Sequence, residues 1–204
     1  RNLGIPTPEF AIVETLAELD GVALAFPLFV KPVAEGTSKG ISIASKICDG
    51  LQLRSRCKLL LERHRQPVLV ETFLPGREFT VGILGTGAAS HAIGVMEIEM
   101  REDAEPEIYS YENKQNYQQR VRFSLVDGEE SGAAARIALA AWKGLNCRDG
   151  GRVDLRCNSA GQINFLEVNP LAGLNPNESD LVIIARLAGM AYRVGTINLQ
   201  AAQR

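Results

Sequence analysis

The chain has 204 residues, of which 46% are hydrophobic and 23% charged, a composition typical of a globular protein large enough to bury a core. Its 22 Lys and Arg against 24 Asp and Glu give a formal net charge of −2, which argues against nucleic acid or an anionic membrane as the partner. No apolar run approaches the roughly 20 residues that a membrane-spanning helix needs, and the first residues do not form the apolar stretch of a signal peptide.

Apolar strand patterns dominate the first third of the chain. The predicted strands are residues 10–13, 28–32, 41–44 and 67–71. Residues 34–40, between the second and third strands, are small and polar, and they predict a loop. Leucines recur at helical spacing in the charged segment 49–63, which is therefore predicted as a helix.

The middle of the chain holds a predicted hairpin and a long polar segment. Residues 77–84 alternate, with their apolar side chains on one face, and continue through a glycine turn into residues 91–96. Residues 101–119 are polar and carry three tyrosines, a pattern that predicts a long loop. Loops of this length often act as lids over a functional site.

A domain boundary is expected near residues 73–76, where Pro75-Gly76 interrupts the strand pattern. The chain would then consist of two lobes. We expect a smaller lobe over residues 1–73 and a larger lobe over residues 74–204.

The last third alternates between helix and strand patterns. Residues 128–146 are predicted as a helix, because small and branched apolar residues form one stripe along them. Two strands follow at residues 151–157 and 162–168, separated by the turn at residues 158–161. The amphipathic tail at residues 181–199 is predicted to be helical.

The cysteines give no sign of a metal centre. Cys48, Cys57, Cys147 and Cys157 form no C-x-x-C pair, and neither histidine lies at metal-ligand spacing. A zinc site is therefore not expected. Scattered cysteines in a chain without an export signal indicate reduced thiols and a cytoplasmic location.

Two neighbouring predicted strands carry acidic and amide side chains. Glu167 and Asn169 point to the same face, because strand side chains alternate with a period of two. Asp154 can join them from the adjacent strand. Magnesium prefers a small set of such oxygen donors and completes its shell with water and phosphate oxygens. The pattern therefore indicates a site for a nucleotide and a metal ion.

The alternative is that Asp154 and Glu167 are solvated residues on the outer faces of their strands. The apolar neighbours on both strands argue against this, since unpaired carboxylates buried among them would cost free energy that a cation relieves. Arg152 lies two residues before Asp154 and shares its strand face. A guanidinium there could bind a phosphoryl oxygen or a developing oxyanion, although a lone strand arginine is more often a surface charge.

Four segments in order carry further motifs. They are Phe29-Val30-Lys31-Pro32 with Glu35-Gly36-Thr37-Ser38-x-Gly40, Val70-Glu71-x-x-Leu74-x-Gly76-x-Glu78-Phe79-Thr80-Val81, Tyr109-x-Tyr111-x-x-Lys114, and Gly151-Arg152-Val153-Asp154 with Phe165-Leu166-Glu167-Val168-Asn169-Pro170-x-x-Gly173. Together they resemble the D-alanine–D-alanine ligases of the ATP-grasp superfamily over nearly the whole chain. The resemblance implies an α+β ATP-grasp fold: two lobes, each with an antiparallel β-sheet and helices, and the nucleotide between them. We expect the chain to be this ATP-grasp portion without the family's N-terminal domain.

The resemblance also implies roles for individual residues. Those implied in ATP binding are Lys31 and Lys114 at the phosphates, Glu35, Gly36 and Ser38 in a phosphate loop, Glu71 and Leu74 at the adenine, and Glu78 at the ribose. The implied ligands of Mg²⁺, or of Mn²⁺ in its place, are Asp154, Glu167 and Asn169. Arg152 and the backbone of Gly173 would stabilise an oxyanion, and Ser179 would lie near the carboxylate of the second substrate.

The implied reaction joins two D-alanines for the synthesis of peptidoglycan precursors. ATP phosphorylates the carboxylate of the first D-alanine, and the amine of the second attacks the acyl phosphate. Such chemistry needs positioning and charge neutralisation more than covalent help from the protein. The implied partners are ATP and D-alanine, with neither nucleic acid nor membrane, and a homodimer of the full-length protein is also expected.

Two other interpretations stay open. The chain could belong to another ATP-grasp ligase that joins a different amino or hydroxy acid, because Gln115 stands where the family commonly has tyrosine, in a loop that helps choose the second substrate. It could also be a catalytically incomplete ATP-binding module. The metal cluster argues against the second interpretation, since a decayed domain need not keep Asp154, Glu167 and Asn169 together.

Overall fold

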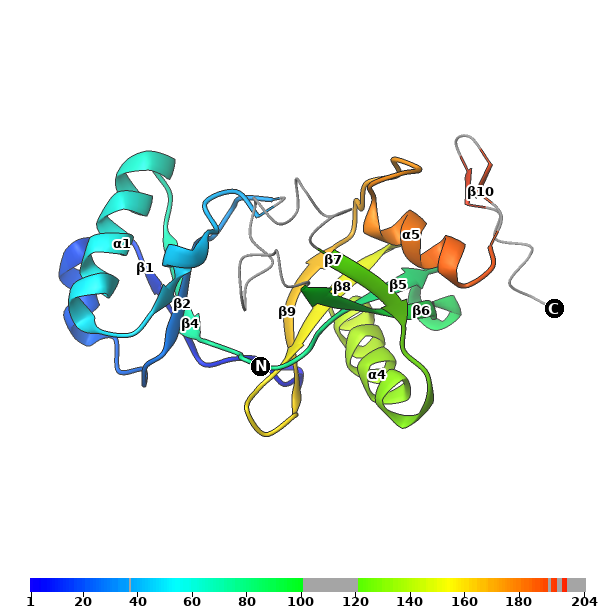
Figure 1. The fold of residues 1–204 in the computed structure, drawn as a ribbon, viewed down its shortest axis with the longest axis horizontal. Helices are drawn as coiled ribbons and strands as arrows, with labels where there is room; N and C mark the ends of the chain where they lie inside the picture. Colours follow the sequence, from blue (N-terminus) through cyan, green and yellow to red (C-terminus); the bar gives the residue numbers. More distant parts are fainter. Residues whose placement is uncertain (37, 101–120, 191, 194–195, 198–204) are drawn as a thin grey trace. The chain divides into compact units, whose positions relative to one another are not determined.

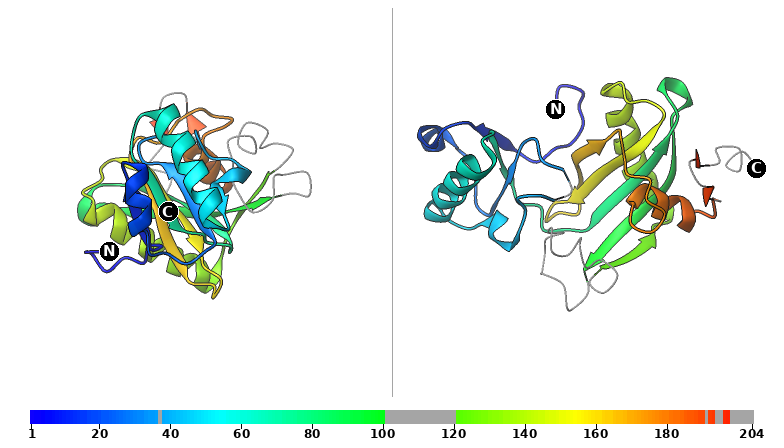
Figure 2. Two further views of the ribbon diagram at one scale, coloured as in Figure 1. Left: turned by 90° about the vertical axis from the view of Figure 1, so that its left-hand side faces the viewer. Right: turned by 90° about the horizontal axis from the view of Figure 1, so that it is seen from above.

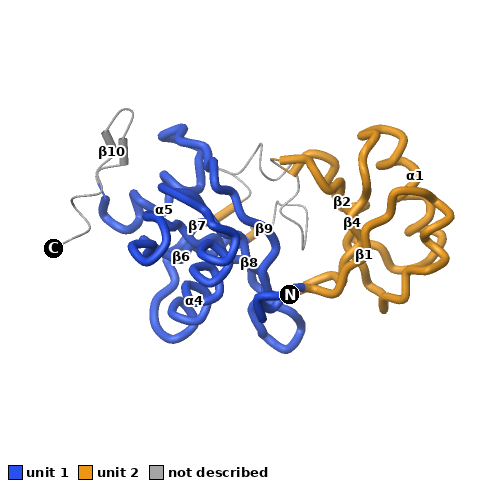
Figure 3. Tube along the Cα trace, turned by 180° about the vertical axis from the view of Figure 1, so that it is seen from behind, with its two compact units in different colours: residues 1–7, 76–99, 123–204 blue, residues 8–75, 100–122 orange. Residues whose placement is uncertain are grey.

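The computed structural model describes residues 1–36, 38–100, 121–190, 192–193 and 196–197. The chain forms two compact units: unit 1 contains residues 1–7, 76–99 and 123–204, and unit 2 contains residues 8–75 and 100–122 (Figure 3). The chain passes from unit 2 to unit 1 between Pro75 and Gly76. Residues 1–7 group with unit 1, where the Phe165 N–H donates to the Pro6 carbonyl at 2.8 Å. The predicted lid at residues 101–119, with Lys114, lies outside the described residues.

Unit 2 is built on a four-stranded antiparallel sheet with the order β1-β4-β2-β3. Its strands are β1 (Phe10–Val13), β2 (Leu28–Pro32), β3 (Lys46–Ile47) and β4 (Val68–Thr72), and its helices are η1 (Leu16–Gly21), η2 (Ile43–Ser45) and α1 (Gly50–His64). Helix α1 begins where the Asp49 carboxylate accepts from the Gln52 N–H at 2.8 Å, and it ends at Arg65 in the left-handed region. Alternate strand residues and α1 form the buried core, which comprises Val13, Leu28, Val30, Ile47, Leu53, Cys57, Leu60, Val68 and Val70.

The strand predicted at residues 41–44 is wrong. The Ser42 N–H donates to Ser45 Oγ at 3.2 Å, and the Ser45 N–H donates to the Ser42 carbonyl at 2.8 Å. These short-range bonds close a 3₁₀ turn in place of a strand ladder. The returning strand is β3, which begins at Lys46 and pairs with Leu28 and Phe29.

Unit 1 is built on a five-stranded sheet with the order β7-β6-β5-β8-β9. Its strands are β5 (Glu78–Leu84), β6 (His91–Met100), β7 (Val121–Leu125), β8 (Gly150–Cys157) and β9 (Ile163–Asn169), and η3 (Gly87–Ala89) joins β5 to β6. The predicted strands are confirmed, whereas β7 is not among the predictions. Helix α4 (Gly128–Gly144) covers one face of this sheet and α5 (Asp180–Leu187) covers the other, as the right-hand view of Figure 2 shows.

The side chains of strand β8 point alternately into the core of unit 1 and to the opposite face of the sheet. Val153 and Leu155 are fully buried in the cluster that contains Trp142 of α4. Because strand side chains alternate, Arg152 and Asp154 point to the other face of the sheet. This second face carries the polar residues predicted to form a site.

Helix α5 lies close to this second face because two strand residues beneath it have no side chain. A Cβ added to Gly82 would lie 3.1 Å from Ile184 Cγ2, and one added to Gly94 would lie 3.0 Å from the same atom. The helix predicted for residues 181–199 is confirmed only as far as Leu187. Gly189, with φ of +76°, ends it, and the short strands β10 (Tyr192–Arg193) and β11 (Thr196–Ile197) follow.

All four cysteines are free: Cys48 is exposed, and Cys57, Cys147 and Cys157 are buried. Burial raises the pKa of the Cys57 thiol to about 11, which leaves it a poor nucleophile at neutral pH. In the described part of the chain, no helix combines the length and apolar character needed to cross a bilayer.

Substituting Gly151 should destabilise unit 1. An added Cβ would lie 2.4 Å from the Asn169 carbonyl oxygen and 2.7 Å from the Trp142 ring. We expect Gly151→Ala to lower the free energy of unfolding in urea by about 1–3 kcal/mol, the usual cost of overpacking. The control is Gly50→Ala at the start of α1, where no atom lies within 4 Å of the added Cβ. Equal stability of the two variants would contradict this packing.

Candidate functional site

Four residues predicted to form the metal and oxyanion sites lie together on the second face of the unit 1 sheet. In the register of β8 and β9, Asp154 is directly opposite Glu167 and Arg152 is directly opposite Asn169. Strand pairing therefore brings Asp154 and Glu167 next to each other, although they are 13 residues apart in the sequence.

The Asn169 amide joins the two carboxylates. Its Nδ2 donates to Asp154 Oδ2 at 3.2 Å and to Glu167 Oε1 at 3.0 Å. Two carboxylates held this close repel each other when both are ionised, and a cation relieves the repulsion. In this structure Asn169 turns its Nδ2 to both carboxylates, so its Oδ1 would face a bound ion only after the amide rotates by half a turn. With that rotation the three residues offer the carboxylate and amide oxygens that Mg²⁺ binds. The residues present therefore fit a magnesium ion.

Within residues 1–36, 38–100, 121–190 and the two short strands after them, no group of three or more His, Cys, Asp or Glu could hold a metal. The candidate site therefore consists of two carboxylates, those of Asp154 and Glu167, with the Asn169 amide as the third side chain. Such a site leaves coordination positions for water and phosphate, as Mg²⁺ sites on nucleotide-binding proteins do.

Thr80 orients Asp154 and was not predicted as a site residue. It lies opposite Asp154 in the register of β5 and β8, and its hydroxyl donates to Asp154 Oδ1 at 3.0 Å. Thr80 is only 1% exposed, so water cannot easily replace Asp154 as the hydrogen-bond partner of its hydroxyl. Alternation along β5 places residues 78, 80 and 82 on this face, but only the pairing with β8 shows which of them meets Asp154.

Arg152 lies between two carboxylates. Its guanidinium Nη1 contacts Asp180, and its Nη2 lies 3.4 Å from Asp154 Oδ2. Asp180 is buried, with 4% exposure, and the Arg152 side chain is partly buried, with 14% exposure. Arg152 Nε is also buried and has no hydrogen-bond partner within the described residues. Asp180 is the second site residue that the sequence analysis missed.

Gly173 and Ser179 belong to the turn that connects β9 to α5. Ser179 Oγ accepts from the Asn175 N–H at 2.9 Å. A Cβ added to Gly173 would lie 2.7 Å from the same oxygen, so the turn closes on the glycine. The Ser179 hydroxyl therefore has its acceptor side occupied by the backbone of Asn175.

Glu78, the predicted ribose ligand, begins β5 on the same sheet face. Its Oε2 accepts from Arg156 Nη1 at 3.1 Å, and both side chains are largely buried. Arg156 Nε also donates to the Gly76 carbonyl at 3.3 Å. The ion pair thus holds Glu78 against the backbone where the chain enters unit 1.

In unit 2, Lys31, predicted to contact the phosphates, forms a largely buried ion pair with Glu71, predicted to contact the adenine. Lys31 Nζ lies 2.9 Å from Glu71 Oε1, with side-chain exposures of 15% and 7%. The pair lies on the sheet face opposite α1, beside the half-exposed apolar residues Phe10 and Ile12. Leu74, the predicted adenine contact, is buried in this unit.

The predicted phosphate loop of unit 2 is anchored at both ends. Glu35 Oε1 accepts from Gln66 Nε2 at 3.1 Å and lies 3.5 Å from His64 Nδ1. At the other end, Arg56 donates to the Gly40 carbonyl at 2.7 Å. The Glu35 carboxylate is thus directed to residues at the end of α1, which indicates an anchoring role for it.

The two other loop residues named in the sequence analysis shape the backbone. The Gly36 carbonyl accepts from the Lys39 N–H at 3.2 Å, and the Ser38 carbonyl accepts from the Ile41 N–H at 3.0 Å. Ser38 has φ of 57°, in the left-handed region. The N–H groups of Lys39 and Ile41 are thus bonded within the loop itself.

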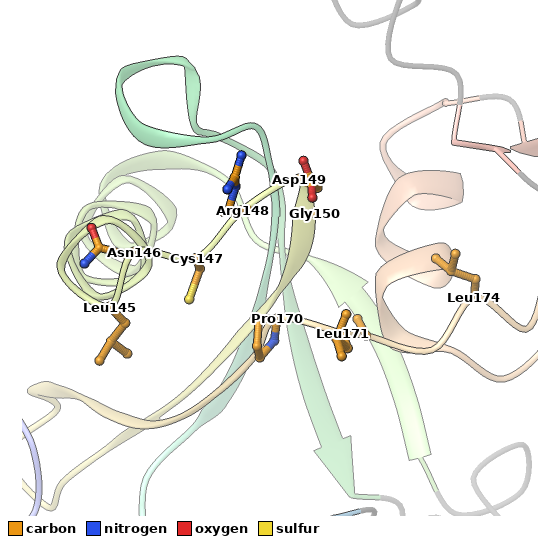
Figure 4. A pocket seen from close by; sticks show the side chains of 10 residues that line it. Leu145, Asn146, Cys147, Arg148, Asp149, Gly150, Pro170, Leu171 and Leu174 are labelled. Carbon is orange, nitrogen blue, oxygen red and sulfur yellow. The ribbon is translucent and has the colours of Figure 1, made fainter.

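A pocket of about 470 Å³ lies in unit 1 between the loops at residues 145–150 and 170–174 (Figure 4). Its lining is largely apolar, and Arg148 and Asp149 are the charged residues that line it. It borders the end of β9, because Pro170, Leu171 and Ala172 line it. None of the site residues predicted from the sequence is among the described residues that line it.

The family model and the curated relatives that match this chain name the same protein family. The family described as "D-ala D-ala ligase C-terminus" matches residues 1–195. The D-alanine--D-alanine ligase of Albidiferax ferrireducens is 34% identical over 198 residues, which cover 94% of this chain and 54% of that protein. The chain spans little more than half the length of the curated relatives it matches.

Solved structures confirm the fold. The VanG D-Ala:D-Ser ligase from Enterococcus faecalis matches with a TM-score of 0.72 at 25% identity, over 93% of this chain and 55% of that chain. A D-alanine--D-alanine ligase from Bacillus anthracis, solved in complex with ATP, matches with a TM-score of 0.70 at 24% identity, over 94% and 59%. The predicted α+β ATP-grasp architecture is therefore correct.

Removing the Thr80 hydroxyl should weaken metal binding. Thr80→Val keeps the shape of the side chain but removes its hydrogen bond to Asp154. Loss of such a supporting bond typically weakens metal affinity by about 10–100-fold, and we expect a loss in this range when free Mn²⁺ is followed by electron paramagnetic resonance. The control is Thr72→Val in unit 2, which should leave Mn²⁺ affinity unchanged. Equal affinities of both variants and the unmodified chain would show that Thr80 does not support a metal ligand.

Proposed function

We propose, because the chain belongs to the D-alanine–D-alanine ligase family, that it binds ATP with Mg²⁺ and joins two D-alanine molecules. The observation that carries this proposal is the cluster of Asp154, Glu167 and Asn169 with Arg152 on the same sheet face. The names of the curated relatives support D-alanine as the substrate.

Unit 1 would supply the metal ligands. Asp154, Glu167 and Asn169 would hold Mg²⁺, or Mn²⁺ in its place, and the bound ion would neutralise charge on the ATP phosphates. Thr80 would hold the Asp154 carboxylate in position through its 3.0 Å hydrogen bond. Glu78 would accept a hydrogen bond from a ribose hydroxyl.

Unit 2 would supply contacts to the base and the phosphates. Glu71 fixes the Lys31 ammonium, which has three N–H donors and can keep this partner while it binds a phosphate oxygen. The adenine would be held by Glu71 and by the backbone of Leu74. The exposed apolar face formed by Phe10 and Ile12 offers surface for an aromatic ring.

The loop from Glu35 to Gly40 would bind the phosphates through its backbone. Gly36 permits close approach of a ligand to the chain, and Ser38 would donate from its hydroxyl. Glu35 would act indirectly, by holding the loop to the end of α1. Lys114, from the segment outside the described residues, would reach the phosphates as well.

The reaction would proceed in two steps. First, the γ-phosphoryl group of ATP moves to a carboxylate oxygen of one D-alanine and releases ADP. The neutral amine of the second D-alanine then attacks the carbonyl carbon, its extra proton is lost to solvent, and the bond from carbon to the phosphate oxygen breaks. Arg152 and the Gly173 N–H would stabilise the oxyanion of the tetrahedral intermediate, and Ser179 would donate its hydroxyl to the carboxylate of the second D-alanine.

The product would serve peptidoglycan precursor synthesis. The four free cysteines are compatible with a reducing compartment, and we place the reaction in the cytoplasm. The expected homodimer of the full-length protein stays a prediction.

The test is ATP-dependent phosphate release by this chain with different acceptors. We expect release to require both Mg²⁺ and D-alanine, and to be lower with D-serine, D-lactate or glycine in place of D-alanine. D-Serine is included because the VanG structure is named as a D-Ala:D-Ser ligase. Mass spectrometry should identify D-alanyl-D-alanine in equimolar amount with the phosphate released.

Two outcomes would contradict the proposal. Phosphate release that is indifferent to D-alanine but rises with another acceptor would indicate a different substrate. ATP binding without turnover for any acceptor would indicate a nucleotide-binding module. The Glu167→Gln variant serves as the negative control, because it removes one charge of the metal cluster and should abolish release in all these assays.

A further inference from the structure

We propose that Asp180 is a positioning residue that fixes the guanidinium of Arg152 and directs its Nε–H to an oxygen of the reacting substrate. This inference rests on the proposed ligase function. It assigns to the first residue of α5 a role in catalysis that acts through Arg152.

The packing of α5 on the sheet explains why Asp180 meets Arg152. Gly82 lies opposite Arg152 in the register of β5 and β8. Because Gly82 has no side chain, Ile184 of α5 packs directly over it. Asp180 lies one helical turn before Ile184 and therefore on the same face of the helix. The absence of a side chain at Gly82 therefore lets α5 pack close enough to the sheet for the Asp180 carboxylate to reach the Arg152 guanidinium.

Burial makes this contact more than a surface ion pair. The side chains of Arg152 and Asp180 are 14% and 4% exposed. A buried carboxylate or guanidinium without a partner is costly, so each group depends on the other. Arg152 Nη2 also lies 3.4 Å from Asp154, which is itself a predicted metal ligand.

Because the guanidinium is planar, the contacts of Arg152 with Asp180 and Asp154 also determine how the whole group is oriented. The group is planar and rigid, so holding Nη1 and Nη2 also fixes the direction of the Nε–H bond. That Nε is buried and has no acceptor within the described residues. A buried donor without an acceptor is unfavourable in the free protein and becomes favourable when a ligand oxygen arrives. Without Asp180, the guanidinium would be drawn toward the carboxylates of the metal cluster.

The first measurement needs no ligand. The Nε–Hε signal of Arg152 is followed by proton–nitrogen NMR of the whole chain and assigned by its absence in Arg152→Lys. We expect this signal to be sharp and protected from exchange with water in the unmodified chain. In Asp180→Asn, which keeps the shape but removes the charge, we expect it to shift and to exchange rapidly. Asp180→Glu should restore part of the protection.

The second measurement is a double-mutant cycle on turnover. We expect Asp180→Asn to lower kcat by about 10–100-fold, as for other supporting residues, with the KM for ATP changed by less than about 2-fold. In an Arg152→Gln background, the same change should lower kcat by less than about 3-fold, because its effect passes through the arginine. The control is Asp127→Asn, which removes a carboxylate from the start of α4 in the same unit. Circular dichroism checks that each variant folds.

The outcomes separate this inference from the proposed function. An unchanged Arg152 signal in Asp180→Asn, or a full 10–100-fold loss in the Arg152→Gln background, would overturn the positioning role. A folded chain without any ATP turnover would instead contradict the ligase proposal. In that case the NMR signal still decides whether Asp180 fixes Arg152.

Discussion

The polar site of unit 1 depends on the side-chain alternation of strand β8. Val153 and Leu155 point into the core, and this fixes Arg152 and Asp154 on the opposite face. A shift of one residue in the register would bury Asp154 against α4 and expose Val153, at a large cost in free energy. The hydrophobic core therefore determines where the candidate metal ligands lie, and β9 adds Glu167 opposite Asp154 through the same register.

In both units, a cationic side chain predicted to bind ligand already forms an ion pair with a carboxylate of the protein. Lys31 is held by Glu71 in unit 2, and Arg152 is held by Asp180 in unit 1. Such pairs reduce the net attraction for a phosphate, but they fix the direction of each cation. Transition-state stabilisation depends on charges that are already oriented and do not have to reorganise during the reaction. The pairs are therefore consistent with a site in which the cations are held in fixed orientations, even though this weakens their attraction for the bound substrate.

Local patterns in the sequence were sufficient for most strands and for the grouping of Asp154, Glu167 and Asn169 on one sheet face, because alternation within β8 and β9 is a property of each segment alone. Thr80 and Asp180 could not be found in this way. Thr80 is identified by the register of β5 against β8, and Asp180 by the close packing of α5 over Gly82. The predicted tail helix was too long because an apolar pattern continues past Gly189, where the backbone turns to positive φ and ends the helix.

Calorimetry of ATP binding tests whether Asp154, Glu167 and Asn169 form a metal site for a nucleotide. We expect the folded chain to bind ATP in the presence of Mg²⁺, and the affinity for ATP to fall by at least about 10-fold without Mg²⁺ or in Glu167→Gln. The exposed Glu62→Gln variant of α1 should bind like the unmodified chain. ATP binding that is independent of Mg²⁺ and unaffected by Glu167→Gln, or no binding by a folded chain, would contradict it.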